Sequence, residues 1–442
     1  MRVHFISIGG AVMHNMALAL HSMGYKVSGS DDEIFEPALS RLKDKGLLPE
    51  KFGWDDSRIT PDIDFIILGM HARADNPELI KAKYLGLKIY SFPEYVYEHS
   101  KNKTRIVVGG SHGKTSTTAM IMHVLHQKNI EFDYLVGSQL EGFERMVKLS
   151  HAPIIVIEGD EYLTSALDLK PKFHWYKPHT AILTGIAWDH INVFPTYEFY
   201  VEQFRIFIDT IEPNGTLIYC SEDKDLANLA TKAECKVLPY DVPEHSIKNG
   251  TTTIHANGKD YPLQVFGKHN LLNLQAAMMA CKTVGVNETD FWQAISNFTG
   301  AAKRLEKIKD TDKIKIFRDF AHSPSKLKAT VKAAIEQFEG FNIIGVFELH
   351  TFSSLNADFL KEYKDSMKGL DIAIVYYNSH VFELKKMEML SPDFVAGEFG
   401  NVKVINNNNE LRETIKSKLT GKDVLLLMSS GNFDGMDINS FG

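Results

Sequence analysis

The chain has 442 residues, of which 44% are hydrophobic and 24% are charged, and its net charge is −7. This composition is typical of a soluble globular protein with about two to four domains, and it argues against a broad nucleic-acid-binding surface. Three widely spaced cysteines form neither a metal-ligand pattern nor a disulfide framework. No apolar run approaches bilayer-spanning length, and Gly9 interrupts the opening apolar stretch before it could act as a signal sequence. We therefore expect a cytoplasmic protein without membrane segments.

The first segment of the chain alternates strands with a helix. The expected elements are a strand over Val3–Ile8, a Gly9–Gly10 turn, a helix ending at Gly24, and strands over Lys26–Ser30 and Phe65–Leu68. This pattern predicts a βαβ half of a dinucleotide-type fold, although the third glycine of the usual fingerprint is missing. Polar residues 100–103 are expected to link this segment to a second domain.

The most informative stretch runs from Arg105 to Ser116. Residues 105–108 predict a strand, residues 109–113 form a glycine-rich turn, and Lys114-Thr115-Ser116 opens a helical pattern that continues to Gln127. Exposed backbone N–H groups and the helix dipole suit a nucleotide polyphosphate, with Lys114 at its terminal phosphates and the Thr115 hydroxyl on Mg²⁺. Val108 stands where the common P-loop has glycine, so the loop is shorter than in kinases and GTPases. The alternative interpretation is a simple tight turn between a strand and a helix.

Two further polar runs follow expected strands of the second domain. Glu158-Gly-Asp-Glu161 follows a strand over Pro153–Ile157, Asp189-His190 follows one over Thr180–Leu183, and a further strand is expected over Thr216–Tyr219. Open α/β sheets bind ligands beyond the carboxyl ends of their strands, and carboxylates there can hold Mg²⁺. The alternatives are a solvated acidic turn and a structural histidine.

Downstream, Asn270 and Asn273 are three residues apart and share one face near the start of a helix. They could read a base edge, or one could cap the helix. The second domain is expected to end near residue 300. Arg304 suits a phosphate across a cleft, and Asp319 and His322 follow a strand in a loop typical of a site. The strands expected in this third segment are Ile314–Phe317, Asn342–Phe347, Ile372–Tyr377 and Val424–Met428.

In their order along the chain, these motifs resemble those of the ATP-dependent Mur ligase superfamily, whose phosphate loop has the same short form. The motifs are Gly-Ser-His-Gly-Lys-Thr-Ser from Gly110, Glu-Gly-Asp-Glu from Glu158, Asp189-His190, His-Asn-Leu-Leu-Asn from His269, Arg304 and Asp-Phe-Ala-His-Ser-Pro from Asp319. The resemblance covers essentially the whole chain. It implies an α/β fold with three domains: a Rossmann-like UDP-sugar-binding domain over 1–101, a central P-loop ATPase domain over 102–300 and a Rossmann-like acceptor-binding domain over 301–442.

The resemblance also implies ATP and Mg²⁺ as cofactors and a role for each matched residue. The implied catalytic residues are Lys114, His190, Arg304 and His322. The implied metal-site residues are Thr115, Glu158 and His190, with Glu158 preferred to Glu161 because it matches the first Glu of the family's run. The implied nucleotide-binding residues are Gly110, Ser111, His112, Gly113, Lys114, Thr115, Ser116, His269, Asn270, Asn273, Arg304 and Asp319, of which Asp319 would bind the ribose or position the third domain. The implied substrate-binding residues are Gly9, Gly10, Ala11, Val12, Met13, Ser30, Asp31 and His71.

Within this family, residues 28–31 and 76–78 resemble the branch that acts on UDP-N-acetylmuramate. The ending Met428–Gly435 favours ligation of the tripeptide L-alanyl-γ-D-glutamyl-meso-diaminopimelate in peptidoglycan recycling, whereas residues 348–353 are more like the ligase that adds L-alanine in de novo synthesis. We expect the tripeptide, with L-alanine as the alternative. A folylpolyglutamate-synthase-like ligase is disfavoured because that group lacks a UDP-type first domain. A nucleotide-binding regulator without turnover is the remaining alternative.

Overall fold

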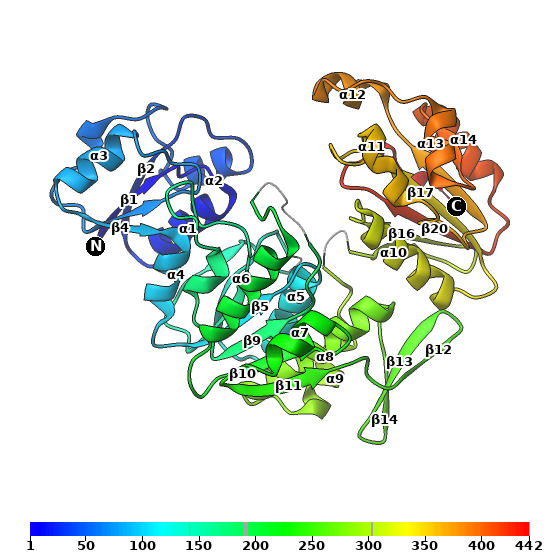
Figure 1. Ribbon diagram of the computed structural model, residues 1–442, viewed down its shortest axis with the longest axis horizontal. Helices are drawn as coiled ribbons and strands as arrows, with labels where there is room; N and C mark the ends of the chain where they lie inside the picture. Colours follow the sequence, from blue (N-terminus) through cyan, green and yellow to red (C-terminus); the bar gives the residue numbers. More distant parts are fainter. Residues whose placement is uncertain (141, 189–192, 302–303, 442) are drawn as a thin grey trace. The chain divides into compact units, whose positions relative to one another are not determined.

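A computed structural model describes residues 1–140, 142–188, 193–301 and 304–441 (Figure 1). The chain forms two compact units. One contains Met1–Asp241 and Leu272–Ala294, and the other contains Val242–Leu271 and Ile295–Gly442. The first unit holds two sheets with mostly parallel strands, and the second holds a six-stranded sheet and a small antiparallel one.

The amino-terminal sheet is parallel, with strand order β2-β1-β3-β4. Its strands are β1 (Arg2–Ile6), β2 (Lys26–Ser30), β3 (Phe65–Leu68) and β4 (Lys88–Ser91), and its helices are α1 (Ala11–Ser22), α2 (Ala38–Asp44), the short η1 (Asp56–Arg58), α3 (Pro77–Tyr84) and α4 (Phe92–Ser100). The predicted βαβ half is confirmed. β1 ends two residues earlier than expected because Ser7 adopts a left-handed conformation with φ of 69°.

The central sheet has the order β11-β10-β9-β5-β8-β6-β7, and only β7 among its strands runs antiparallel to its neighbour. Its strands are β5 (Thr104–Gly109), β6 (Phe132–Leu135), β7 (Val147–Lys148), β8 (Ile154–Glu158), β9 (Thr180–Leu183), β10 (Thr216–Cys220) and β11 (Lys236–Tyr240). Its helical segments are α5 (Lys114–Gln127), η2 (Lys172–Trp175), α6 (Tyr197–Asp209), α7 (Lys224–Ala230), α8 (Lys268–Thr283), whose first turn belongs to the second unit, and α9 (Glu288–Ile295). The strands predicted here are confirmed. β5 lies between β8 and β9, so the loop at its carboxyl end occupies a topological switch point of the sheet, where ligands bind.

The six-stranded sheet of the second unit has the order β15-β16-β20-β17-β18-β19, with β15 antiparallel to β16. Its strands are β15 (Glu306–Asp310), β16 (Ile314–Asp319), β17 (Asn342–Glu348), β18 (Ile372–Tyr376), β19 (Lys403–Ile405) and β20 (Asp423–Met428). Its helical segments are α10 (Pro324–Gln337), α11 (Ala357–Leu360), η3 (Lys361–Tyr363), α12 (Ser379–Lys385), α13 (Pro392–Phe399), α14 (Asn408–Ser417), η4 (Phe433–Gly435) and η5 (Ile438–Ser440). The predicted strands are again confirmed.

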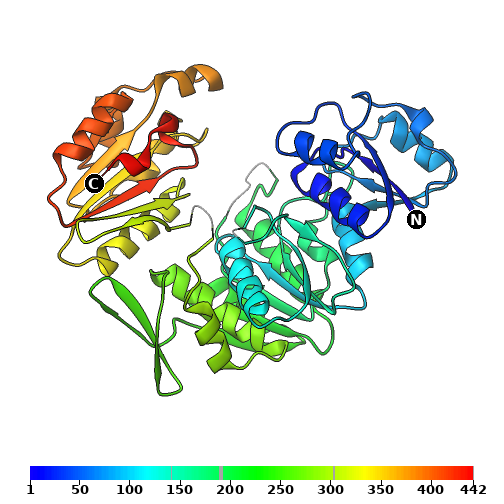
Figure 2. The ribbon, with the colours of Figure 1, turned by 180° about the vertical axis from the view of Figure 1, so that it is seen from behind.

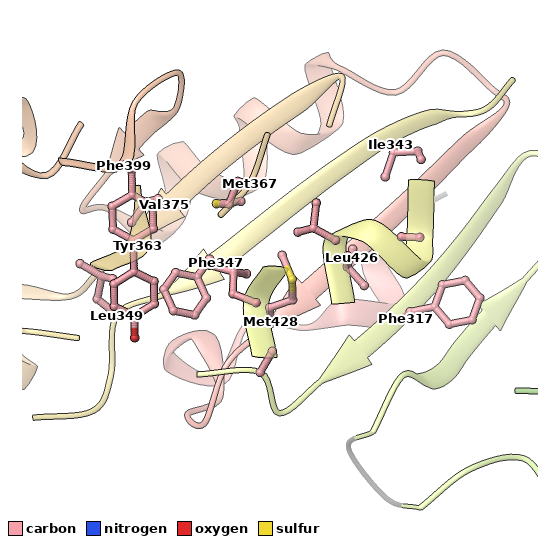
Figure 3. Packing of buried hydrophobic residues seen from close by; sticks show 14 of the residues in the cluster. Phe317, Ile343, Phe347, Leu349, Tyr363, Met367, Val375, Phe399, Leu426 and Met428 are labelled. Atoms are coloured by element: carbon pink, nitrogen blue, oxygen red, sulfur yellow. The ribbon is translucent and has the colours of Figure 1, made fainter. Parts of the chain in front are cut away.

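Both faces of this sheet are buried. Leu426 and Met428 of β20 lie in one hydrophobic cluster, and the alternate residues Leu425 and Leu427 lie in another. Figure 3 shows the first cluster, in which Phe347 packs near Tyr363, whose ring stacks on that of Phe399 with centroids 5.1 Å apart. A strand buried on both faces reads as a continuous apolar run, which is why β20 could be predicted from its sequence.

The sequence interpretation missed a small antiparallel sheet, β12 (His245–Lys248), β13 (Thr251–Ala256) and β14 (Lys259–Pro262), which forms a narrow ribbon drawn in green in Figures 1 and 2. Its two turns are Asn249-Gly250 and Asn257-Gly258, and all four residues have positive φ. Asn-Gly between two short polar strands is a strong hairpin signal, so this sheet was predictable. None of the described helices is both long and apolar enough to cross a membrane.

Candidate active site

The phosphate loop joins β5 to α5 and depends on two glycines. Gly110 and Gly113 have φ of +124° and +84°, values that side-chain-bearing residues rarely adopt. A Cβ at Gly110 would collide with the Thr184 hydroxyl, and one at Gly113 would lie 2.5 Å from the Asn273 Oδ1. Gly113 caps α5 without a side-chain hydrogen bond, so the first-turn N–H groups of this helix are available to an anion.

Lys114 begins α5 and is held by two oxygens. Its Nζ donates to the Gly110 carbonyl at 2.6 Å and to Glu161 Oε2 at 2.8 Å. Glu161 also accepts from the Tyr200 hydroxyl, which shares a 2.8 Å hydrogen bond with Ser111 Oγ in the loop. Burial lowers the pKa of the Lys114 ammonium, but attraction to Glu161 and to nearby carboxylates outweighs burial and leaves this pKa above its usual value. Lys114 is therefore positively charged at neutral pH.

Thr115 and Glu158 form a second pair beside this lysine. Thr115 Oγ1 donates to Glu158 Oε1 at 2.8 Å, and the Gly137 N–H donates to Glu158 Oε2 at 2.9 Å. Glu158 ends β8 and is 9% exposed. The hydroxyl and carboxylate oxygens together are the hard ligands that Mg²⁺ takes, so this donor set fits the ion.

The donor set is also an open one. Among the described residues there is no cluster of three or more His, Cys, Asp or Glu side chains able to enclose a metal. Mg²⁺ in nucleotide sites is bound by one or two protein groups together with phosphates and water, so an incomplete cage agrees with that use. The predicted ligand His190 lies in the stretch 189–192, outside the described residues.

The first unit contains a cavity of about 400 Å³, which is lined by residues of both the amino-terminal segment and the central segment. Among its lining residues are Gly10, Ala11, Val12, Met13 and His71 from the first segment, and Lys114, Glu158, Asp160 and Lys172 from the central one. Gly10 caps α1 without a side-chain hydrogen bond, so a second helix N-terminus opens on this cavity. The packing of α1 against the central segment supports the arrangement, because Asn15 Oδ1 accepts from the Met146 N–H at 3.1 Å.

The other predicted residues of the first segment shape its glycine turn rather than line the cavity. Asp31 Oδ2 accepts from the Gly9 N–H at 2.7 Å. Burial raises the pKa of Asp31, and its hydrogen bonds from the Gly9 and Asp32 N–H groups oppose this rise. Ser30 is buried, its hydroxyl donates to Glu78, and its carbonyl accepts from the N–H groups of Ser7 and Ile8.

The remaining predicted loop residues serve different purposes. Ser111 is buried, with its N–H donating to Gly185 O at 2.9 Å and its Oγ accepting from the Ala187 N–H at 2.8 Å, so it anchors the loop. His112 is exposed and Ser116 is half-buried. Asn273 belongs to α8, and its carboxamide lies against Gly113 of the loop.

Lys172 and Asp160 were absent from the sequence-based site. Lys172 Nζ donates to Asp160 Oδ2 at 2.6 Å, and both residues line the cavity. Asp160 belongs to the acidic run that the sequence singled out, but Lys172 follows 12 residues later in the short helix η2. No local motif marks that lysine, so only the folded chain reveals it.

In the second unit, Asp319 is buried at the carboxyl end of β16. It accepts from the Leu305 N–H at 2.7 Å, the Ala321 N–H at 2.9 Å and the Thr330 hydroxyl at 3.0 Å. These contacts engage both carboxylate oxygens of Asp319 within the second unit, and its role at the ribose or in positioning the third domain stays a prediction. The guanidinium of Arg304 lies over the Phe320 ring, 5.1 Å from its centroid.

Three other predicted residues of this unit have defined surroundings. Asn270 donates through Nδ2 to the Phe266 carbonyl at 2.9 Å, and His322 Nδ1 hydrogen-bonds with the Phe320 carbonyl at 2.8 Å. Burial lowers the pKa of His269, while Asp319 opposes and Arg304 reinforces this shift, so the imidazole is neutral at pH 7.

The carboxyl ends of β17 and β20 carry a further polar cluster, formed by Glu348, Ser429 and their neighbours. Ser429 Oγ donates to Glu348, and Glu348 Oε2 accepts from the Phe433 N–H at 3.0 Å. Burial raises the pKa of Glu348, against the hydrogen bonds from Ser429 and Phe433. His350 lies beside this cluster, with its Nδ1 3.5 Å from Ser430 Oγ.

Family models match nearly the whole chain in three segments. The Mur ligase family catalytic domain matches residues 2–104, the Mur ligase middle domain 108–281 and the Mur ligase glutamate ligase domain 303–431. The UDP-N-acetylmuramate–L-alanine ligase of Caldicellulosiruptor bescii is 30% identical over 84% of this chain and 82% of its own length. The UDP-N-acetylmuramate–L-alanyl-γ-D-glutamyl-meso-2,6-diaminoheptandioate ligase of Haemophilus influenzae is 28% identical over 98% of this chain and 97% of its own.

Solved structures show the same fold. The UDP-N-acetylmuramate–alanine ligase of Thermotoga maritima aligns with a TM-score of 0.68 at 22% identity, and the murein peptide ligase of Psychrobacter arcticus aligns with a TM-score of 0.64 at 22% identity. Each alignment covers 98% of this chain and 97% of the other. With its three-domain α/β fold and its short phosphate loop, this chain belongs to the Mur ligase family of ATP-dependent ligases that form amide bonds.

Proposed function

We propose that this Mur ligase uses UDP-N-acetylmuramate as its carboxylate donor and joins an amine to it. The observation that carries this proposal is the cavity shared by the Gly10–Met13 turn and the Lys114–Glu158 region. A nucleotide sugar whose diphosphate lay at the α1 N-terminus would extend toward the phosphate loop. Its carboxylate would then approach the terminal phosphate of ATP.

The reaction proposed has two steps. The donor carboxylate attacks the γ-phosphate of ATP and displaces ADP, which leaves an acyl phosphate. The amine then attacks the acyl carbon, and phosphate departs as the amide forms. Lys114 stabilises the negative charge on the transferred phosphoryl group, and the helix N-terminus at Gly113 holds the polyphosphate chain.

Mg²⁺ would be held by Thr115 and Glu158, with His190 added on the family resemblance, and when bound it would neutralise phosphate charge. We further propose that Asn273, with His269 and Asn270, binds adenine, and that Arg304 contacts ATP phosphates. His322 is assigned to the reaction cleft, and Asp319 to positioning of the third domain. The domain boundaries 1–101, 102–300 and 301–442 and a cytoplasmic location complete the proposal.

We propose L-alanine as the amine acceptor, because several relatives that match nearly the whole chain carry that activity in their names. The tripeptide expected from the sequence is the second candidate. It is supported by the Haemophilus influenzae relative, whose identity is within two percentage points of that of the C. bescii ligase, and by the ending Met428–Gly435.

The decisive experiment is a reaction of the purified full chain with ATP, Mg²⁺ and UDP-N-acetylmuramate, supplied with either L-alanine or the tripeptide. We expect ADP release and a product heavier by the L-alanine residue. ADP release with the tripeptide alone would reassign the acceptor and keep the donor. No ADP release with either amine would refute the ligase proposal, and no binding of UDP-N-acetylmuramate in calorimetry would refute the donor.

A further inference from the structure

Lys172 is a buried lysine at the wall of the cavity. Its side chain is 9% exposed, its Nζ donates to Asp160 Oδ2 at 2.6 Å, and it lies 5.4 Å from the centroid of the Tyr162 ring. The ion pair with Asp160 therefore holds this ammonium at the cavity wall.

The backbone that carries Lys172 is held rigidly. The Lys172 N–H donates to the Tyr162 carbonyl at 3.0 Å, and the Phe173 N–H donates to the Asp160 carbonyl at 3.0 Å. Phe173 is fully buried, and its ring stacks on that of Phe207 with centroids 4.5 Å apart. Because these contacts fix η2, the ammonium is positioned in advance of any ligand.

Stability alone is a weak reason for this arrangement. Lys172 loses hydration on burial, whereas the Asp160 side chain is 42% exposed, so solvent weakens the attraction that would compensate for that loss. An ammonium has three N–H groups, and the bond to Asp160 uses one of them. Two N–H directions remain for an anion that enters the cavity.

We infer that Lys172 binds the carboxylate of the donor substrate and aligns it with the phosphate loop, an inference that rests on the proposed donor. The cavity holds two lysines with separate positions. Lys114 is directed to Gly110 and Glu161 at the loop, where the ATP phosphates are expected, whereas Lys172 comes from η2. The donor's diphosphate is expected at the α1 N-terminus, which leaves its carboxylate for Lys172 on the central wall.

The test compares two nucleotides by calorimetry, without ATP or Mg²⁺. UDP-N-acetylmuramate carries an ether-linked lactyl group that ends in the carboxylate, and UDP-N-acetylglucosamine has a hydroxyl in place of that group. A charge-assisted hydrogen bond predicts that the wild-type chain binds the first roughly tenfold to a hundredfold more tightly. In Lys172→Met this preference should disappear through weaker binding of UDP-N-acetylmuramate, with the affinity for UDP-N-acetylglucosamine unchanged.

Two further variants complete the design. Lys170→Met is the matched control, because Lys170 is exposed and lies 4.1 Å from the Trp175 ring centroid, and it should keep the preference. Asp160→Asn removes the carboxylate that competes for Lys172, so it should increase the preference severalfold. This variant decides the question if Lys172→Met does not fold.

Several results would overturn the inference. Equal affinities of the wild-type chain for the two nucleotides would do so without any variant. An intact preference in Lys172→Met, an equal weakening of both nucleotides in that variant, or an unchanged or reduced preference in Asp160→Asn would do so as well. If the wild-type chain bound neither nucleotide, the donor assignment itself would fall, and this inference would fall with it.

Discussion

Replacement of Gly113 by alanine tests whether the short loop requires glycine for two separate reasons. The first is backbone conformation, since φ of +84° costs an alanine about 1–2 kcal/mol. The second is space, because the new Cβ would lie 2.5 Å from Asn273 Oδ1, and overpacking costs about 1–3 kcal/mol. We therefore expect Gly113→Ala to lower the free energy of unfolding by roughly 2–5 kcal/mol and to weaken ATP binding.

The matched control is Gly24→Ala. Gly24 has φ of +87°, but a Cβ there would meet no atom within 4 Å. This variant carries the conformational cost alone, about 1–2 kcal/mol, and should bind ATP normally. Adding Asn273→Ala to Gly113→Ala should recover part of the lost stability, because the colliding carboxamide is removed.

The measurements are urea unfolding of the ligand-free chain, followed by circular dichroism, and calorimetry with ATP. If Gly113→Ala lost no more stability than Gly24→Ala, the steric argument would be wrong. If it also bound ATP as tightly as the wild-type chain, the loop would not be the phosphate cradle that its geometry indicates.

Four other changes test the site and the fold. Lys114→Met should reduce ADP release about a hundredfold to a thousandfold, measured under saturating ATP, because a charge on the transferred phosphate loses its partner. Glu158→Gln should raise the Mg²⁺ concentration for half-maximal activity at least about tenfold, and an unchanged Mg²⁺ titration would remove Glu158 from the metal site. Burial raises the pKa of Asp133, but hydrogen bonds from His99, Lys103 and Ser150 outweigh burial, so the pKa lies below its usual value. The ionised carboxylate therefore stabilises the folded chain above about pH 4, and this stabilisation is lost as the pH falls through the lowered pKa. Lys103→Met should therefore cost about 3–5 kcal/mol at pH 7 and less below about pH 4, as pH-dependent urea unfolding would reveal. His350 lies in the stretch 348–353 that resembles the L-alanine-adding ligase, beside Ser430, so we expect it to contact the amine acceptor. His350→Ala should raise the KM for that acceptor about tenfold and leave the KM for ATP unchanged, and a change in the KM for ATP alone would place His350 outside the acceptor site.

The elements predicted from sequence were those with the strongest local signals. The strands β5 and β20 are buried between parallel neighbours, and their sequences contain the continuous hydrophobic runs 106–108 and 424–428. The hairpins at Asn249-Gly250 and Asn257-Gly258 were missed because their strands are polar and half-buried, although the turns carried a usable signal.

The parts of the site that consecutive residues form could be predicted from the sequence. The parts that depend on contacts between distant segments could not. The phosphate loop is a single stretch, and its sequence gives both the turn and the helix start. By contrast, the pairing of Lys172 with Asp160 and the approach of the Asn273 carboxamide to Gly113 join residues from separate elements. The hydrogen bond from the Ser30 hydroxyl to Glu78 also joins residues 48 positions apart, so no local motif reveals it.

The acidic run after β8 shows how the fold gives similar residues separate partners. Glu158 accepts from the Thr115 hydroxyl, Asp160 from Lys172 and Glu161 from Lys114, at distances between 2.6 and 2.8 Å. In sequence, three carboxylates within four residues suggest a single metal-binding cluster. In the structure, Asp160 and Glu161 pair with lysines at separate places around one cavity, whereas Glu158 pairs with the hydroxyl of Thr115, the residue after Lys114 in the phosphate loop. Under the proposed function, the run would thus place two lysines for anionic groups and one carboxylate for Mg²⁺, which is the electrostatic condition for bringing a carboxylate and a phosphate together.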